Sequence, residues 1–174
     1  MQQYCVRKAK RSDFNAILKL HRKVSKTKDG IARAAEEITK SYVKNFIKKA
    51  DKNGLILVIE NPKNHREIIA EMHCYSDNVK SFNHVFSNLT IVVDSDHHNQ
   101  GLGRKIFSHL LEEIRAKRQD IKRVELRCRT SNKAALHLYQ SLGFKIEGIC
   151  KNGILNSKGE LEDDCFLGLI INNS

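Results

Sequence analysis

The sequence predicts an α/β protein with a mostly antiparallel, mixed central sheet of about seven strands and helices on both faces. Residues 55–59 are too apolar for an exposed strand, which places them in the middle of a covered sheet. Residues 91–105 read as an apolar strand, a polar turn with glycines and the start of a helix. After that helix, Val124, Leu126 and Cys128 alternate with polar residues, as in a strand with one buried face.

Composition bounds the class of protein. A chain of 174 residues with 40% hydrophobic content is long enough for one domain with a core, so we expect a single domain over residues 1–174. The first eleven residues lack an apolar core and no run of about eighteen apolar residues occurs, which predicts a cytoplasmic protein without a membrane segment. The five cysteines are widely spaced and form no CxxC pair, so we expect reduced thiols and no metal.

The chain is strongly basic. Its 31 Lys and Arg residues exceed its 20 Asp and Glu residues, which gives a formal charge of +11. Such a charge favours a polyanionic cofactor, an acidic protein or nucleic acid without choosing among them. The charges are spread along the chain as on solvated helix faces, and only 6% of residues are aromatic, which argues against nucleic acid. A non-catalytic basic module that binds RNA or an acidic protein remains the alternative from another class.

The first half of the chain predicts two helices and three strands. A strand at residues 4–9 precedes a helix that Ser12 or Asp13 can cap. The apolar face of that helix carries His21, which we interpret as a half-buried packing histidine. A second helix is expected near residues 34–50. The central strand and residues 68–74 then form a hairpin, and residues 76–87 are expected to be a loop.

The second half predicts a crossover and a closing hairpin. A strand at residues 88–93 leads into a helix beyond Gly103 with a regular apolar stripe, and the strand at residues 124–128 completes a right-handed parallel crossover. Residues 132–142 are a further helix, and Gly143 is its C-terminal stop. Residues 144–150 and 165–171 are expected to pair around a polar loop.

The turn around Gly101 and Gly103 is a candidate phosphate site, because an open helix N-terminus presents unpaired N–H groups and a positive dipole end. A dinucleotide-binding fingerprint needs a third glycine where the chain has Ile106. A P-loop needs a Gly-Lys-Ser/Thr sequence, which does not follow. Taken alone, the two glycines are equally explained by a structural turn.

A second motif changes this interpretation. Residues 132–144 read Asn-Lys-Ala-Ala-Leu-His-Leu-Tyr-Gln-Ser-Leu-Gly-Phe. Together with the glycine turn they resemble the GNAT superfamily of acyl-CoA-dependent N-acetyltransferases. That family has a Gln/Arg-x-x-Gly-x-Gly/Ala loop and a later Asn-x-x-Ala-x-x-Leu-Tyr helix followed by Gly-Phe. The second motif is complete here, whereas His98 stands at the usual Gln/Arg position of the first.

The resemblance implies acetyl-CoA as co-substrate and assigns its contacts. The edge of the strand formed by Ile91, Val92 and Val93 would hydrogen-bond the pantetheine arm, which Asn132 would also contact. Tyr139 would face the thioester sulfur. The backbone amides that would hold the pyrophosphate belong to Asn99, Gln100, Gly101, Leu102, Gly103, Arg104 and Lys105.

Acetyl transfer needs a neutral amine and a proton for the departing thiolate. Tyr139 has the chemistry of the proton donor. Relatives that modify ribosomal proteins carry a glutamate five residues before the motif asparagine, where this chain has Arg127. Glu125 and Glu71 are the candidate bases, each acting through water, and a structural ion pair is an equal explanation for Glu125. Four histidines qualify by residue type alone: His73, His84, His97 and His98.

The acceptor is a primary amine in this interpretation. The segment 143–163 looks like GNAT members that acetylate free amino acids or other small amines, and a protein amine is the alternative. Acidic residues near the final hairpin could attract a cationic amine, and solvated loop charges explain them equally well: Glu160, Glu162, Asp163 and Asp164. No membrane partner is expected, and the oligomeric state is open, with a homodimer as one possibility.

Overall fold

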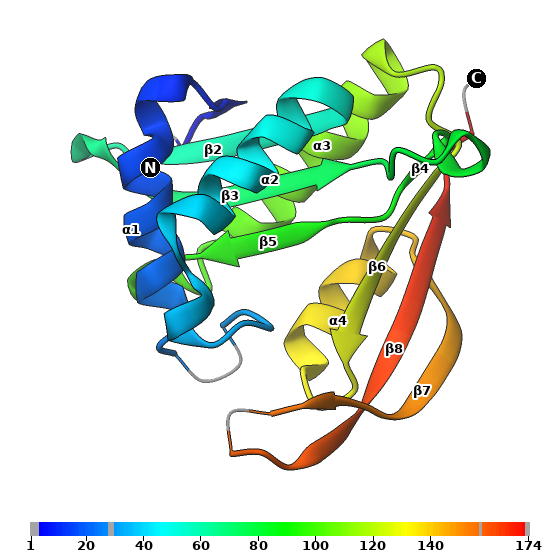
Figure 1. Ribbon diagram of the computed structural model, residues 1–174. Coiled ribbons are helices and arrows are strands. Elements are labelled where there is room, and N and C mark those ends of the chain that lie inside the picture. Colours follow the sequence, from blue (N-terminus) through cyan, green and yellow to red (C-terminus); the bar gives the residue numbers. More distant parts are fainter. Residues whose placement is uncertain (1–3, 28–29, 157, 173–174) are drawn as a thin grey trace. The chain divides into compact units, whose positions relative to one another are not determined.

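The computed structural model describes residues 4–27, 30–156 and 158–172. Backbone contacts divide the chain into two compact units. Unit 1 comprises Met1–Tyr75 and Thr90–Glu112, and unit 2 comprises Ser76–Leu89 and Glu113–Ser174. Figure 1 shows a sheet with helices in each unit.

Unit 1 is built on a four-stranded antiparallel sheet in the order β1-β2-β3-β5. Its strands are β1 (Val6–Lys8), β2 (Gly54–Asn61), β3 (Asn64–Tyr75) and β5 (Thr90–Val93). Helices α1 (Phe14–Val24) and α2 (Lys40–Asn53) cover one face, and α3 (Leu102–Lys117) covers the other (Figure 1). The strand at residues 55–59 lies inside this sheet with every side chain buried, as predicted.

The apolar face predicted for α1 is buried in the core of unit 1. Ile17 and Val24 pack there with Ile56 and Val58 of β2 and with Val92 of β5. The pattern of α1 therefore identified the side that meets the sheet, because its apolar residues recur with the helical period.

The starts of both N-terminal helices differ from the prediction in detail. Asp13 occupies the N-cap position of α1, as predicted, but its side chain makes no capping hydrogen bond to that helix. Its carboxylate instead accepts the backbone N–H of Lys10 at 2.7 Å and closes a 3-10 turn over Arg11–Asp13. Helix α2 begins at Lys40 rather than near residue 34, because Thr39 caps it by accepting the Tyr42 N–H at 3.0 Å. A separate 3-10 turn, Ala35–Glu37, precedes it.

Unit 2 contains a second four-stranded sheet in the order β4-β6-β8-β7. Its strands are β4 (Val85–Phe86), β6 (Arg123–Arg129), β7 (Lys145–Leu155) and β8 (Leu161–Ile170). The β7–β8 pair is the predicted closing hairpin, and it extends into the segment expected to be a loop. Helix α4 (Lys133–Ser141) is followed by Gly143 at φ 96°, which confirms the predicted stop.

The α/β class with mixed sheets and helices on both sides is confirmed, and the strand arrangement differs in detail. The described residues form eight strands in two sheets rather than about seven in one. Strands β5 and β6, which flank α3, do not pair with each other, and the parallel neighbour of β6 is β4. Strand β4 lies inside the segment predicted as a loop, because two residues are too few to show a periodic pattern.

Candidate functional site

The loop between β5 and α3 exposes its backbone. Asn99 and Gly101 have positive φ angles of 59° and 74°, a conformation that glycine adopts readily. A Cβ added at Gly101 would have no neighbour within 4 Å, so the position faces open space. Helix α3 begins at the next residue, Leu102. The loop therefore presents the N-terminal amides of a sixteen-residue helix without a covering side chain at Gly101.

Contacts from other parts of unit 1 hold this loop. Asp94 accepts the backbone N–H of Asp96 at 3.0 Å and starts a 3-10 turn. The Lys23 ammonium on α1 lies 2.6 Å from a carboxylate oxygen of each of these two aspartates, which raises the pKa of Lys23. The Tyr4 hydroxyl donates to the side chain of Gln100. Helix α1 and the segment before β1 thus contact the two ends of the loop.

His98, the irregular position of the first motif, folds back onto β5. Its Nε2 lies 3.2 Å from the carbonyl oxygen of Val93, which accepts the hydrogen bond. This carbonyl belongs to the strand predicted to bind the pantetheine arm. Strand β5 is an end strand of its sheet and pairs with β3 on one side. In the described part of unit 1, no second strand pairs with its other edge.

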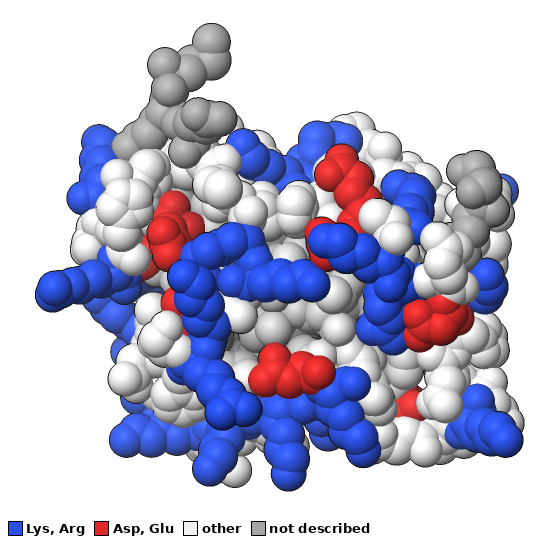
Figure 2. All heavy atoms as spheres, turned by 90° about the horizontal axis from the view of Figure 1, so that it is seen from above, with Lys and Arg blue, Asp and Glu red and all other residues white. Residues whose placement is uncertain are grey.

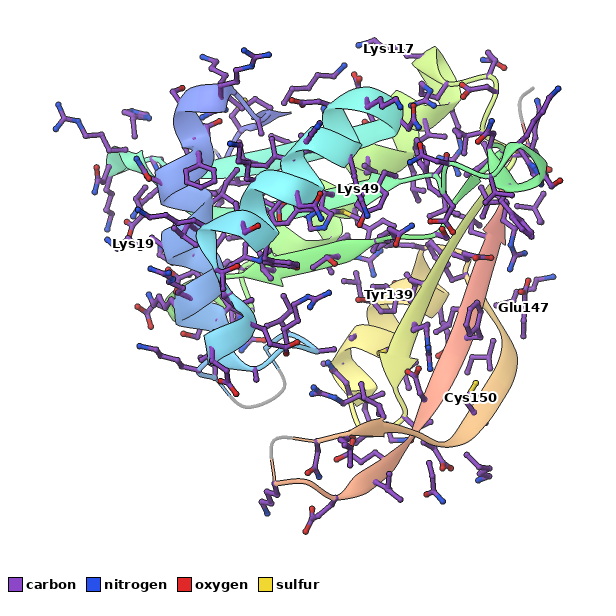
Figure 3. All side chains as sticks on the ribbon, viewed as in Figure 1. Lys19, Lys49, Lys117, Tyr139, Glu147 and Cys150 are labelled. Atoms are coloured by element: carbon purple, nitrogen blue, oxygen red, sulfur yellow. The ribbon has the colours of Figure 1, made fainter. Side chains whose placement is uncertain are left out.

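Helix α4 in unit 2 carries the residues of the second motif. The carboxamide oxygen of Asn132 caps the helix by accepting the Ala135 N–H at 3.1 Å. Tyr139, labelled in Figure 3, is 8% exposed and lies beside Phe144. Burial, with a smaller effect from Cys128, raises the pKa of Tyr139 above its usual value. Its hydroxyl therefore keeps its proton at neutral pH and can act as a donor.

The acidic candidates on unit 2 are engaged in ion pairs. Glu125 accepts from Arg123 at 2.9 Å, which is the structural alternative weighed above. Arg127, at the position of the glutamate in ribosomal-protein acetyltransferases, lies 2.5 Å from Asp164. Asp163 pairs with Lys151 at 2.7 Å. In the final hairpin, Glu160 and Glu162 accept hydrogen bonds from Asn156. These contacts fit a role in holding the hairpin.

Glu71 in unit 1 belongs to a buried cluster that the sequence did not reveal. Its carboxylate lies 2.8 Å from His21 Nε2 and 3.0 Å from His73 Nδ1. His21 is fully buried rather than half-buried. Among the described residues this is the one group of donors close enough to hold a metal ion, and in it the Glu71 carboxylate accepts a hydrogen bond from each imidazole. A Glu-x-His pair on one face of a strand and an inward histidine on a helix were the available signals.

Basic side chains are distributed over the surface. Figure 2 shows Lys and Arg residues across the face in view, with carboxylates between them. This distribution fits the solvated faces predicted from the sequence. Within the described residues, no helix is both long enough and apolar enough to cross a bilayer.

Comparison with known proteins identifies the family. Residues 23–144 match the Acetyltransferase (GNAT) family, and this span includes both motifs. The chain belongs to that family, as the motifs predicted. A GNAT acetyltransferase of Streptococcus pneumoniae has a similar structure, with a TM-score of 0.86 and 25% identity over 97% of this chain and 100% of that one.

Two relatives with assigned activities are similar over part of the sequence. The ribosomal protein bS18-alanine N-acetyltransferase of Escherichia coli K12 is 38% identical over 81 residues, which cover 47% of this chain and 53% of that protein. The L-amino acid N-acyltransferase MnaT of the same strain is 41% identical over 59 residues, covering 33% of this chain and 32% of that protein. The chain thus spans about half the length of the first curated relative and about a third of the second.

Proposed function

We propose that the protein is an N-acetyltransferase that transfers the acetyl group of acetyl-CoA to a primary amine. The observation that carries this proposal is the exposed loop of unit 1, in which an end strand leads through Gly101 at φ 74° into the open N-terminus of α3. Backbone N–H groups in such a loop bind phosphate oxygens without needing a cationic side chain. Membership of the GNAT family supports the assignment.

Acetyl-CoA would be bound along its length by this chain. The amides of residues 99–104 would bind the pyrophosphate, with Arg104 and Lys105 adding positive charge. The predicted contribution of the Lys105 amide is dropped, because that N–H donates to the Gly101 carbonyl at 3.0 Å. The open edge of Ile91–Val93 would hydrogen-bond the pantetheine arm as an added strand does. Val93 would contribute through its remaining backbone atoms, because His98 already binds its carbonyl oxygen. Asn132 would contribute its amide N–H group to the same arm, since its carbonyl oxygen caps α4.

Tyr139 would act as the general acid. The neutral amine attacks the thioester carbon, and the C–S bond breaks as the C–N bond forms. The tyrosine hydroxyl gives its proton to the departing sulfur and recovers a proton from the acylated nitrogen, so that the phenol is restored. Its raised pKa suits this role, because a phenol that is protonated at neutral pH is available as a donor in every cycle.

The acceptor we favour is a free amino acid or another small amine. The similarity to MnaT supports this class. Arg127, held by Asp164, also supports it, because ribosomal-protein acetyltransferases have a glutamate at the corresponding position. An α-amine at a protein N-terminus is the second candidate, which the similarity to the bS18-alanine N-acetyltransferase favours.

An acceptor screen tests the proposal. Thiol release from acetyl-CoA would be followed with free amino acids, small amines and a peptide with an N-terminal alanine, and products would be identified by mass spectrometry. We expect saturable thiol release with an acetylated small amine. Preferential modification of the peptide would replace the small-amine assignment with the protein one. Absence of transfer to every amine would contradict the enzyme assignment.

A further inference from the structure

The His21–Glu71–His73 cluster is a fixed hydrogen-bonded chain inside unit 1. His21 comes from α1, and Glu71 and His73 lie on the same face of β3. His21 and Glu71 have no exposed surface, whereas His73 is 3% exposed. Of the three residues, His73 is therefore the one with any solvent-exposed surface. Burying a carboxylate costs several kcal/mol unless it is paired, so an arrangement of this kind needs a physical reason.

The hydrogen bonds fix the tautomer of each histidine. Burial raises the pKa of Glu71, but the two imidazoles outweigh it and lower that pKa to about 2, so the carboxylate is ionised and only accepts. His21 must donate from Nε2, and His73 must donate from Nδ1. The Nδ1 of His21 is buried without a partner, which favours leaving that atom unprotonated, because a buried unpaired N–H is costly. His73 keeps Nε2 as a proton acceptor.

Aromatic rings hold the histidines in these orientations. Phe46 on α2 stacks on His73 with a centroid distance of 4.0 Å and an interplanar angle of 7°. The same ring stacks on His21 at 5.2 Å. A ring held by stacking on one side and by a hydrogen bond at Nδ1 presents its Nε2 in one direction. This is the arrangement of an imidazole base with an orienting carboxylate.

The remaining charged groups near the cluster are few. Tyr42 on α2 lies beside His21, with the Arg33 guanidinium 4.4 Å from the centre of its ring. Tyr75 on β3 lies beside His73, with the Lys49 ammonium 5.3 Å from its ring. Figure 3 shows Lys49 on α2. The strand neighbours of Glu71 on both sides are apolar, Val58 of β2 and Val92 of β5. Glu71 is thus the carboxylate that contacts His73.

The position of His73 in the sheet connects the cluster to the proposed reaction. His73 is the register partner of Thr90 at the start of β5. Neighbouring strands are about 5 Å apart, so His73 is one strand away from the proposed pantetheine edge. We propose that His73 accepts the proton of the acceptor ammonium, and that Glu71 and His21 are positioning residues that hold its ring. This inference rests on the proposed acetyl transfer.

The proton balance of this step is complete. The ammonium of the acceptor passes one proton to His73 Nε2 by way of a water molecule, and the resulting imidazolium is paired with the Glu71 carboxylate. The neutral amine then attacks the thioester carbon as described above. After product release the imidazolium returns its proton to solvent, which matches the one net proton released when an ammonium becomes an amide.

The kinetic test begins with variants of His73 and Glu71 and one control. His73→Asn keeps an N–H donor near the Nδ1 position but cannot accept a proton. We expect kcat to fall by about 100-fold at pH 7, the usual contribution of a positioned base. The rate should then rise with pH without the plateau of the wild type. Glu71→Gln should lower kcat less than His73→Asn does, because the ring keeps Nε2 as a proton acceptor but loses the carboxylate that orients it. His65→Asn, at an exposed position of the same strand, should leave the profile unchanged.

Two substitutions of His21 distinguish a role in orienting the cluster from a role in core packing. His21→Gln retains a donor near Nε2 and should keep most of the activity, whereas His21→Leu should not. The acetyl-CoA affinity of each variant, measured by calorimetry, should equal that of the wild type. Unchanged kcat and pH profile in His73→Asn would overturn the inference while leaving the acetyltransferase assignment in place. Absence of transfer by the wild type itself would remove both.

A measurement on the wild-type protein tests the inference without relying on the folding of any variant. Histidine ¹⁵N spectra report the tautomer of each ring. We expect the Nε2–H form for His21 and the Nδ1–H form for His73. A Nε2–H tautomer at His73 would overturn the inference, as would stoichiometric zinc retained by the purified protein and lost in His73→Asn, because Nδ1 would then be a ligand rather than a donor.

Discussion

At the scale of single residues, the same burial has opposite consequences for Tyr139 and Glu71. Desolvation, with a smaller effect from Cys128, raises the pKa of Tyr139 and the hydroxyl stays protonated. Desolvation raises the pKa of Glu71, but the hydrogen bonds from two imidazoles outweigh it and lower that pKa. One side chain is thereby kept as a proton donor and the other as an anion.

The role of Tyr139 predicts a selective loss of rate. In Tyr139→Phe, kcat should fall by about 100-fold, since a general acid contributes this much or more. The affinity for acetyl-CoA should be unchanged, because the ring remains. Pre-steady-state thiol release and calorimetry provide the two measurements. A variant with the turnover of the wild type would rule out Tyr139 as the acid.

The lowered pKa of Glu71 predicts that the free energy of unfolding depends on pH. Its folded pKa of about 2 lies below the ordinary value, so its contribution is fully present above about pH 4.5 and is lost as pH falls toward 2. The free energy of unfolding of the wild type should therefore exceed that of Glu71→Gln by on the order of 2 kcal/mol near pH 6, and this difference should shrink on acidification. Urea unfolding at pH 6 and pH 3 checks this. A difference that stays constant with pH would contradict it.

At the scale of elements, the proposed acetyl-CoA site depends on the turn that precedes α3. Gly101 is needed for its positive φ and for the open space beside it. In Gly101→Val we expect acetyl-CoA binding to be lost and the free energy of unfolding to fall by about 1–2 kcal/mol from backbone strain. Calorimetric titration and urea unfolding give the two quantities.

Gly159 in the β7–β8 turn provides a matched control. Its φ is 79° and a Cβ there would also meet nothing within 4 Å. Gly159→Val should show a similar loss of stability and should bind acetyl-CoA as the wild type does. Equal loss of binding in both variants would mean that strain, rather than the loop, is responsible.

Lys23 links α1 to the same loop. In Lys23→Met the ion pairs with Asp94 and Asp96 are lost, which should weaken acetyl-CoA binding about two- to fivefold, because the lysine is 40% exposed and its pairs are partly screened. Lys19→Met, on an exposed position of the same helix, should have no effect. The dissociation constants of both variants, measured at low salt, test this. Equal affinities would show that the loop does not depend on α1.

At the scale of the whole molecule, the sequence predicts most of the elements and part of the site. Long apolar runs and helical periodicity located β2, α1 and α3, and the Asn132–Phe144 motif located α4. The two-residue β4 and the start of α2 were missed, because the first is too short for a pattern and the second depends on a local cap. The His21–Glu71–His73 cluster was missed because it forms through contacts between distant segments.

The net charge of +11 makes a prediction about partners. If the basic surface binds acetyl-CoA, this co-substrate should compete with any other bound polyanion. The affinity of the protein for acetyl-CoA should also fall moderately as the salt concentration rises. RNA binding that is strong, salt-dependent and unaffected by acetyl-CoA would favour the alternative of a non-catalytic module. Filter binding with and without acetyl-CoA separates the two. A homodimer remains a prediction, which sedimentation can test.

The central claim is acetyl transfer from acetyl-CoA to an amine by this chain. Its most direct measurement is the stoichiometry of the reaction, with thiol release and acetylated product followed in the same sample for the wild type, Tyr139→Phe and Gly101→Val. We predict one thiol released per acetylated amine, with saturation in both substrates and loss of activity in both variants. Absence of acetyl-CoA binding and of amine-dependent thiol release by the wild type would contradict the account.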